Sequence, residues 1–136
     1  MSDELARARP RPCPSCPYRR DVASGVWAAN EYEKLPDYDG PTWDQPPAAF
    51  GCHQADGYIC SGWLGHRRPE DLLAVRLGVL SGALDPSVLN YWTDVPLFES
   101  GAEAAEHGLA DLENPGPDAQ RVMDKLLRAR AAREQQ

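Results

Sequence analysis

The chain has 136 residues and a formal net charge of −7, with 14 basic side chains against 21 acidic ones. This length is typical of one domain, and 13 prolines and 11 glycines predict a largely irregular backbone. No apolar run approaches the roughly 18 residues of a membrane helix, and the first twelve residues lack the apolar segment of a secretory signal. We therefore expect a cytoplasmic protein that does not interact with a membrane.

The charge is unevenly distributed along the chain. Residues 21–117 carry a net charge of −12, whereas residues 1–20 carry +3 and residues 118–136 carry +2. The acidic charge of residues 21–117 repels phosphate backbones, which argues against duplex nucleic acid as the main ligand. Another protein is the partner that we expect.

The N-terminal third has few signals of regular structure. Residues 1–12 alternate Arg, Ala and Pro with little to bury, and we expect a disordered arm. Ser24-Gly25 indicates a turn, residues 28–35 a short helix ended by Pro36, and residues 36–48 a long loop. A loop of this length in a compact domain is usually functional or held in place by another group.

The longest helical period lies in the middle of the chain. Pro69 suits the first position of a helix, and Leu73, Leu77, Leu80 and Leu84 recur on one stripe. We therefore expect the main core helix here, packed over the predicted hairpin that carries Cys52 and Cys60.

Two further helices are predicted towards the C-terminus. Ser100 and Glu103 form a capping box, and the helix that they open is expected to end at Gly108. Residues 114–136 form a turn, a last amphipathic helix and a fraying tail. The apolar residues of that helix are Val122, Met123, Leu126 and Leu127.

Four cysteines have a spacing that calls for a chemical explanation. Cys13 and Cys16 form a Cys-x-x-Cys turn, which points two sulfurs at one place. If residues 55–57 form a three-residue hairpin loop with glycine at its positive-φ position, Cys52 faces Cys60 across the hairpin. A turn and a hairpin would then supply four thiols to one tetrahedral metal site.

Three kinds of chemistry suit four cysteines. Structural zinc takes four thiolates and can hold together a domain with a small core. A [4Fe-4S] cluster also takes four cysteines, and a proline after a ligand, such as Pro17, occurs in ferredoxins. A reactive dithiol is the third possibility, although such motifs lie between a strand and a helix. Zinc is our first interpretation and the cluster our second.

The histidines and tryptophans near the cysteines have supporting roles in this prediction. In a strand, His53 points away from the face that Cys52 uses, so it is expected beside the metal rather than on it. His66 is a second candidate for such a role or for an alternative ligand. His107 is interpreted as structural because a cation suits the end of a helix. All four tryptophans are expected in the core or shielding the site: Trp27, Trp43, Trp63 and Trp92.

No catalytic constellation is apparent in the sequence. There is no nucleophile elbow, phosphate loop or His-Glu-x-x-His segment, and four cysteine ligands leave no open position on a metal. The sequence thus favours a binding module over an enzyme. Our first hypothesis is a zinc-stabilised protein-interaction module, and the alternative is an iron–sulfur protein that senses redox state or carries electrons.

Several short motifs recur together in a known group of proteins. The segments Cys-x-x-Cys-Pro-Tyr-Arg-Arg-Asp, Ser-Gly-Val-Trp, Phe-x-Cys-His and Cys-x-Gly-Trp are present in this order. Together they resemble a family of small bacterial and phage-borne proteins of unknown function, over about residues 13–82. Ser61 departs from that pattern, which more often has alanine there. The resemblance implies a shared cysteine-centred fold and no particular activity.

The predicted architecture is α+β, mostly α with a small β-hairpin, in a compact metal-stabilised single domain with a long irregular loop. Residues 1–12 form the disordered arm, residues 13–113 the four-cysteine domain with the core helices, and residues 114–136 the C-terminal helix and tail.

Overall fold

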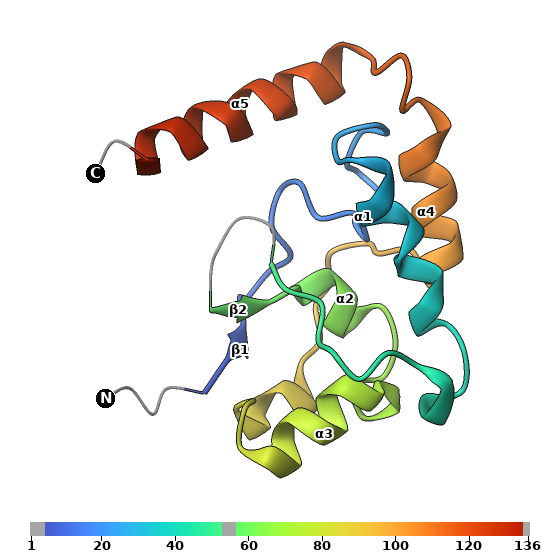
Figure 1. Ribbon diagram of the computed structural model, residues 1–136, viewed down its shortest axis with the longest axis vertical. Helices are drawn as coiled ribbons and strands as arrows, with labels where there is room; N and C mark the ends of the chain where they lie inside the picture. Colours follow the sequence, from blue (N-terminus) through green and yellow to red (C-terminus); the bar gives the residue numbers. More distant parts are fainter. Residues whose placement is uncertain (1–4, 53–56, 135–136) are drawn as a thin grey trace.

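Figure 1 shows a computed structural model of the chain, which describes residues 5–52 and 57–134. It is a small, mostly helical domain with one two-stranded parallel sheet, so the predicted α+β class with mainly helical content is confirmed. Within the described ranges, no helix is both long enough and apolar enough to cross a membrane. The α-helices are α1 (Ala29–Glu33), α2 (Ser61–Gly65), α3 (Leu73–Ser81), α4 (Gly101–Ala110) and α5 (Pro117–Glu134). The 3₁₀ helices are η1 (Leu35–Tyr38), η2 (Thr42–Asp44), η3 (Pro69–Asp71) and η4 (Pro86–Asn90), and the strands are β1 (Arg7–Ala8) and β2 (Tyr58–Ile59).

The described part of the N-terminal arm is ordered, contrary to the disorder that its composition predicted. Strand β1 pairs in parallel with β2. The Ala6 N–H donates to Ala83 O over 3.0 Å, and the Asp85 N–H donates to Ala6 O over 2.9 Å. Backbone pairing thus orders this segment, together with partial burial of Ala6 and Ala8 against the core, and side-chain composition gives no signal of backbone pairing.

The hairpin before α2 has a different register from the predicted one. Gly51 pairs with Ile59, so Cys52 lies opposite Tyr58, and Phe50 lies opposite Cys60. The prediction that Cys52 faces Cys60 is therefore wrong by two residues. Gly57 does have the predicted positive φ, at 82°, whereas His53 and the rest of the expected loop lie outside the described residues.

Helix α3 buries a different face from the predicted leucine stripe. The segment from Pro69 first forms the 3₁₀ turn η3, and the α-helix begins only at Leu73. Leu72 and Val75 are fully buried, whereas Leu77 is 43% exposed and Leu80 is 85% exposed. The segment has apolar residues on two stripes, and the stripe of Leu72, Val75 and Val79 faces the core.

Leu84 belonged to the predicted stripe and is buried for a separate reason. Gly82 ends α3 with φ 80°, a left-handed conformation that glycine adopts without steric cost. The reversal lays Leu84 back against Gly78, where an added Cβ would lie 2.5 Å from the Leu84 side chain. The burial of Leu84 therefore follows from the turn and not from the helical period.

Helix α4 is docked on α1 and η1 through two glycines. Added Cβ atoms at Gly101 and Gly108 would lie 2.0 Å from Leu35 O and 2.1 Å from the Tyr32 ring, respectively. Ser100 caps the helix as predicted, with its Oγ accepting from the Glu103 N–H over 3.1 Å. The predicted end at Gly108 is wrong, because the helix continues to Ala110 and Gly108 instead makes room for Tyr32.

The long loop over residues 36–48 is held by side-chain hydrogen bonds. The buried Gln45 donates to Gly40 O and Asp71 O, each over 3.0 Å, and accepts from the Leu73 N–H over 3.0 Å. Thr42 Oγ1 also donates to Asp71 O over 2.8 Å. The loop is thus fixed to η3 and to the start of α3.

Helix α5 lies across one end of the body in Figure 1 and packs on it through a small second core. Val122, Met123 and Leu126 contact this core, which contains Val22 and Val26. Three of the four predicted apolar residues of this helix therefore pack inward, and Leu127 is exposed.

Candidate functional site

Two successive turns carry the first cysteine pair. The Cys16 N–H donates to Cys13 O over 3.0 Å, and the Arg19 N–H donates to Cys16 O over 3.1 Å. Pro14 and Pro17 each occupy the second position of a turn, where the fixed φ of proline is favourable. The two turns bury the sulfur-bearing side chains of both cysteines.

Cys60 approaches this pair from the end of β2. It caps helix α2, with its Sγ accepting from the Trp63 N–H over 3.4 Å. The Sγ atoms of Cys16 and Cys60 lie 3.5 Å apart. This approach depends on Gly62, because a Cβ there would lie 2.2 Å from the Cys16 Sγ.

Two of the buried sulfurs have hydrogen-bond partners other than thiols. The Trp63 N–H donates to the Cys60 Sγ over 3.4 Å, and Ser15 Oγ lies within hydrogen-bond distance of the Cys13 Sγ, at 3.8 Å. A hydrogen bond donated to a sulfur stabilises its thiolate form.

The crowding of the thiols acts in the opposite direction. The neighbouring Cys16 thiol, together with burial, raises the pKa of Cys13 well above its usual value. For Cys16 the Cys13 thiol lowers the pKa, but the Cys60 thiol and burial outweigh it, and the pKa is raised. Thiolates at these positions therefore require a cation beside them.

Arg19 stands next to the cysteine turn but is already engaged. Its guanidinium donates two hydrogen bonds to Asp21, at 2.7 and 2.8 Å, and a third to Pro12 O at 3.1 Å. It closes the turn from outside by joining the segments before Cys13 and after Cys16. It is therefore a support for the turn.

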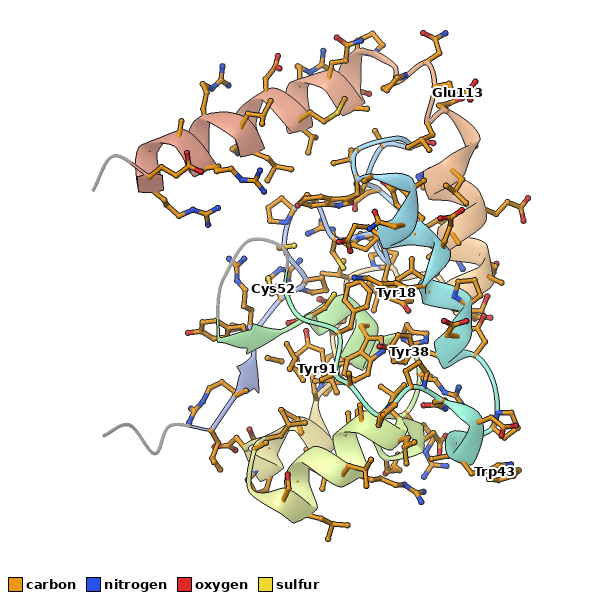
Figure 2. All side chains as sticks on the ribbon, in the orientation of Figure 1. Tyr18, Tyr38, Trp43, Cys52, Tyr91 and Glu113 are labelled. Atoms are coloured by element: carbon orange, nitrogen blue, oxygen red, sulfur yellow. The ribbon has the colours of Figure 1, made fainter. Side chains whose placement is uncertain are left out.

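Cys52 is placed differently from the other three cysteines. It is partly buried and packs against the main core, and it lies on the tube that leads into the hairpin in Figure 2. In the observed register it is the diagonal neighbour of Cys60 on one face, a relation that separates Cα atoms by about 7–8 Å. Over residues 5–52 and 57–134, no group of three or more His, Cys, Asp or Glu side chains is arranged as a metal site. The structure thus brings the Cys16 and Cys60 sulfurs within 3.5 Å of each other, with Cys13 on the turn that carries Cys16.

His66 lies in an aromatic cluster behind the cysteines. Its ring stacks on Tyr18 with centroids 4.4 Å apart, its Nδ1 bonds to Trp63 O, and burial lowers its pKa. Within the described part of the chain, three buried polar atoms have no hydrogen-bond partner: Tyr18 Oη, Trp63 Nε1 and His66 Nε2. Sequence reasoning missed Tyr18, although its place two residues after Cys16 was a signal.

Two of the four tryptophans support the site and two do not. Trp63 is fully buried, and the Trp27 Nε1–H donates to Ser15 O over 2.8 Å, which fixes the cysteine turn. Trp43 and Trp92 are 78% and 75% exposed, so the prediction of a core or shielding role is wrong for them. Trp43 lies within η2, and Trp92 follows η4. Their apolar character alone did not indicate whether they would be buried.

His107 has the structural role that was predicted for it. Its Nε2 bonds to Val22 O over 2.6 Å, which joins the end of α4 to the segment after the cysteine turn. The neighbouring Ser24 Oγ donates to Gly108 O over 3.2 Å and accepts from the Asp111 N–H over 2.9 Å.

Comparison with known proteins places the chain in a family. Neither the curated proteins nor the solved structures include a match. A family model covers residues 8–130, which contain all four cysteines and every described helix up to most of α5. A family of unknown function is what the resemblance implied, whereas the shared cysteine motif and the bacterial or phage origin stay predictions. The chain belongs to DUF6283, a family of unknown function.

Proposed function

We propose that the chain is a zinc-stabilised protein-interaction module, with Cys13, Cys16, Cys52 and Cys60 as the ligands. The observation that carries this proposal is the approach of the buried Cys16 and Cys60 sulfurs to 3.5 Å, beside the turn that also carries the buried Cys13. A hydrogen-bond donor such as the Trp63 N–H, 3.4 Å from the Cys60 Sγ, orients a thiolate ligand and tunes its charge in a metal site. A divalent cation would remove the conflict between the buried thiols, since coordination deprotonates them.

The separation of two sulfurs supports a single ion over a cubane cluster. Two thiolates on one tetrahedral zinc, at about 2.3 Å each, lie roughly 3.8 Å apart. The Cys16 and Cys60 Sγ atoms lie 3.5 Å apart. In a [4Fe-4S] cluster each cysteine binds a different iron, which spreads the sulfurs further.

The proposal requires Cys52 to move towards the other three cysteines when the metal binds. It shares a hairpin face with Cys60 in diagonal register, so a shift of a few ångströms would bring its sulfur to the other three. Zinc binding and the final packing of the hairpin would then be one event.

The same arrangement disfavours a reactive dithiol. A reactive cysteine is a partly exposed thiolate with a lowered pKa, whereas Cys13 and Cys16 are buried and their pKa values are raised. With four cysteines on zinc there is also no open position for substrate. We therefore propose a binding role and no catalysis.

The interaction surface that we propose includes the loop over residues 36–48. Side-chain hydrogen bonds fix this loop, and it presents Trp43, which is mostly exposed. Tryptophan is enriched among residues that dominate protein interfaces. A partner with a basic surface would also match the net charge of −12 over residues 21–117.

Metal analysis of purified protein tests the proposal. We expect one zinc per chain in wild-type protein and in the exposed-site control Ser87→Ala, and loss of zinc in Cys16→Ser, Cys52→Ser and Cys60→Ser. Addition of a chelator should unfold the wild-type protein, and circular dichroism measures this unfolding. A brown protein that contains iron and sulfide would instead support the iron–sulfur alternative, and an oxidant should then bleach its colour. A reduced, metal-free chain that unfolds at the same denaturant concentration with and without zinc would refute the zinc proposal.

A further inference from the structure

A groove of about 510 Å³ runs between α5 and the cysteine turn. One wall is formed by the cysteine turn and residues 26–28, and the other by one face of α5. The lining residues used below are Ser15, Trp27, Met123, Leu126, Ala129 and Arg130.

The α5 wall changes character along its length. Val122 and Leu126 come first, and Ala129, Arg130 and Arg133 follow at spacings that keep them on the same helical face. Two basic side chains, Arg130 and Arg133, therefore lie towards the end of α5, and a third, Lys125, lies among the apolar residues nearer its start. None of the described lining residues is acidic.

This charge is opposite to that of the surrounding molecule. The chain as a whole carries −7, so a groove with basic residues and no acidic ones selects for an anion. Because the rest of the lining is apolar, the selected ligand must also have an apolar body.

We propose that this groove binds a long-chain carboxylate. The alkyl chain lies between the Trp27 ring and the Met123 and Leu126 side chains, and the carboxylate accepts hydrogen bonds from the Arg130 guanidinium. The C-terminal end of a helix disfavours an anion through its dipole, but charge-assisted guanidinium–carboxylate bonds are the stronger effect.

The size of the groove argues for a small amphiphile over a protein. Small-molecule sites have volumes of about 300–1,000 Å³, and the groove lies within this range. A stable protein partner covers about 800 Å² of each surface, which would extend well beyond the groove. The inference goes beyond the zinc-dependent module and does not rest on it, since the wall that selects the ligand belongs to α5.

Calorimetric titration with sodium laurate, below the concentration at which it forms micelles, tests the head-group contact. We expect wild-type protein to bind laurate and to bind dodecanol, its neutral counterpart, more weakly. Arg130→Gln should weaken laurate binding about tenfold, as expected for one charge-assisted contact, and leave dodecanol binding unchanged. The matched control is Arg128→Gln, which removes the same charge from the same helix outside the groove. It should change the affinity for laurate less than about twofold.

A second pair of variants tests the location of the alkyl chain. Ala129→Trp fills the groove from an exposed position and should abolish laurate binding, whereas Ala132→Trp, on the same helix outside the groove, should retain it. Circular dichroism checks that both variants keep their helix content. Absence of laurate binding to wild type, or equal effects of Arg130→Gln and Arg128→Gln, would overturn the proposal. So would sedimentation showing a dimer that Ala129→Trp dissociates, because a second copy would then be the occupant.

Discussion

At the scale of single residues, Gly62 decides how closely the two halves of the cysteine centre can approach. A methyl group there would lie 2.2 Å from the Cys16 Sγ and 3.0 Å from the Tyr18 Cβ. Both neighbours are fully buried, so neither can move aside freely. We expect Gly62→Ala to lower the free energy of unfolding by about 1–3 kcal/mol, the usual cost of overpacking.

Urea denaturation measures this effect, and Gly51→Ala is the matched control. Gly51 lies in the hairpin, its φ is not positive, and an added Cβ would meet no atom within 4 Å. Its substitution should change the free energy by less than about 0.5 kcal/mol. Equal losses in the two variants would contradict the close approach of Cys16 to α2.

His66 gives the protein a predicted dependence on pH. Burial lowers the pKa of His66 in the folded state, so below a pH of about 6.5, the ordinary value, the unfolded chain binds more protons than the folded chain. Stability is therefore full above that pH and falls as the pH decreases, by at most about 1.4 kcal/mol per pH unit for one proton.

Unfolding curves between pH 7.5 and 5 should show this decline in wild type and a shallower one in His66→Gln. Protonation of the cysteines also releases metal in acid, so the two proteins are compared in the same metal state. Parallel declines in wild type and variant would show that His66 takes up no proton on unfolding.

At the scale of elements, α3 distinguishes the buried stripe from the exposed one. Leu72 is fully buried and Leu80 is 85% exposed. Leu72→Ala should cost about 2–5 kcal/mol, because it leaves a cavity, whereas Leu80→Ala should cost less than about 0.5 kcal/mol. Thermal unfolding of the two variants measures the contrast, and a large effect of Leu80→Ala would mean that the leucine stripe faces a core after all.

At the scale of the whole molecule, the N-terminal arm ties the β2 region to the turn after α3. Its backbone bonds to Ala83 and Asp85 and accepts hydrogen bonds from the Ser61 and Tyr91 hydroxyls. Removing residues 1–10 should cost about 2 kcal/mol, since several hydrogen bonds of about 1 kcal/mol each are offset in part by the entropy of ordering the arm.

Chemical denaturation of the truncated chain measures this cost. The control is Arg7→Ala, which removes only an exposed ion pair to Asp85, at 3.2 Å, and leaves the backbone pairing intact. It should change the stability by less than about 1 kcal/mol. A truncated chain as stable as the full one would show that the arm is a passive attachment.

Local signals predicted much of this structure, and long-range ones did not. The predicted Cys-x-x-Cys turn forms, Gly57 has the expected positive φ, and the Ser100 cap forms. Each of these depends on residues within four positions of one another. The grouping of the two cysteine pairs at one metal ion joins distant segments and stays a prediction.

The failures occur where the local pattern allowed two arrangements or carried no signal. The register that places Cys52 opposite Tyr58 depends on the length and type of the turn, and a shift of two keeps every side chain on its face. The face of α3 depended on which of two apolar stripes the core would take. The pairing of Ala6 with Leu84 involves no side-chain pattern that composition could show.

That last pairing limits when this part of the chain can acquire its full structure. Ala6 and Leu84 are neighbours in space, and Cys16 meets Cys60 across 44 positions of sequence. A nascent chain grows from its N-terminus, so β1 can pair with β2 earlier than Ala6 can pair with Leu84. Contacts of such high contact order slow folding. Until β1 pairs with β2, the β2 edge is open to other chains.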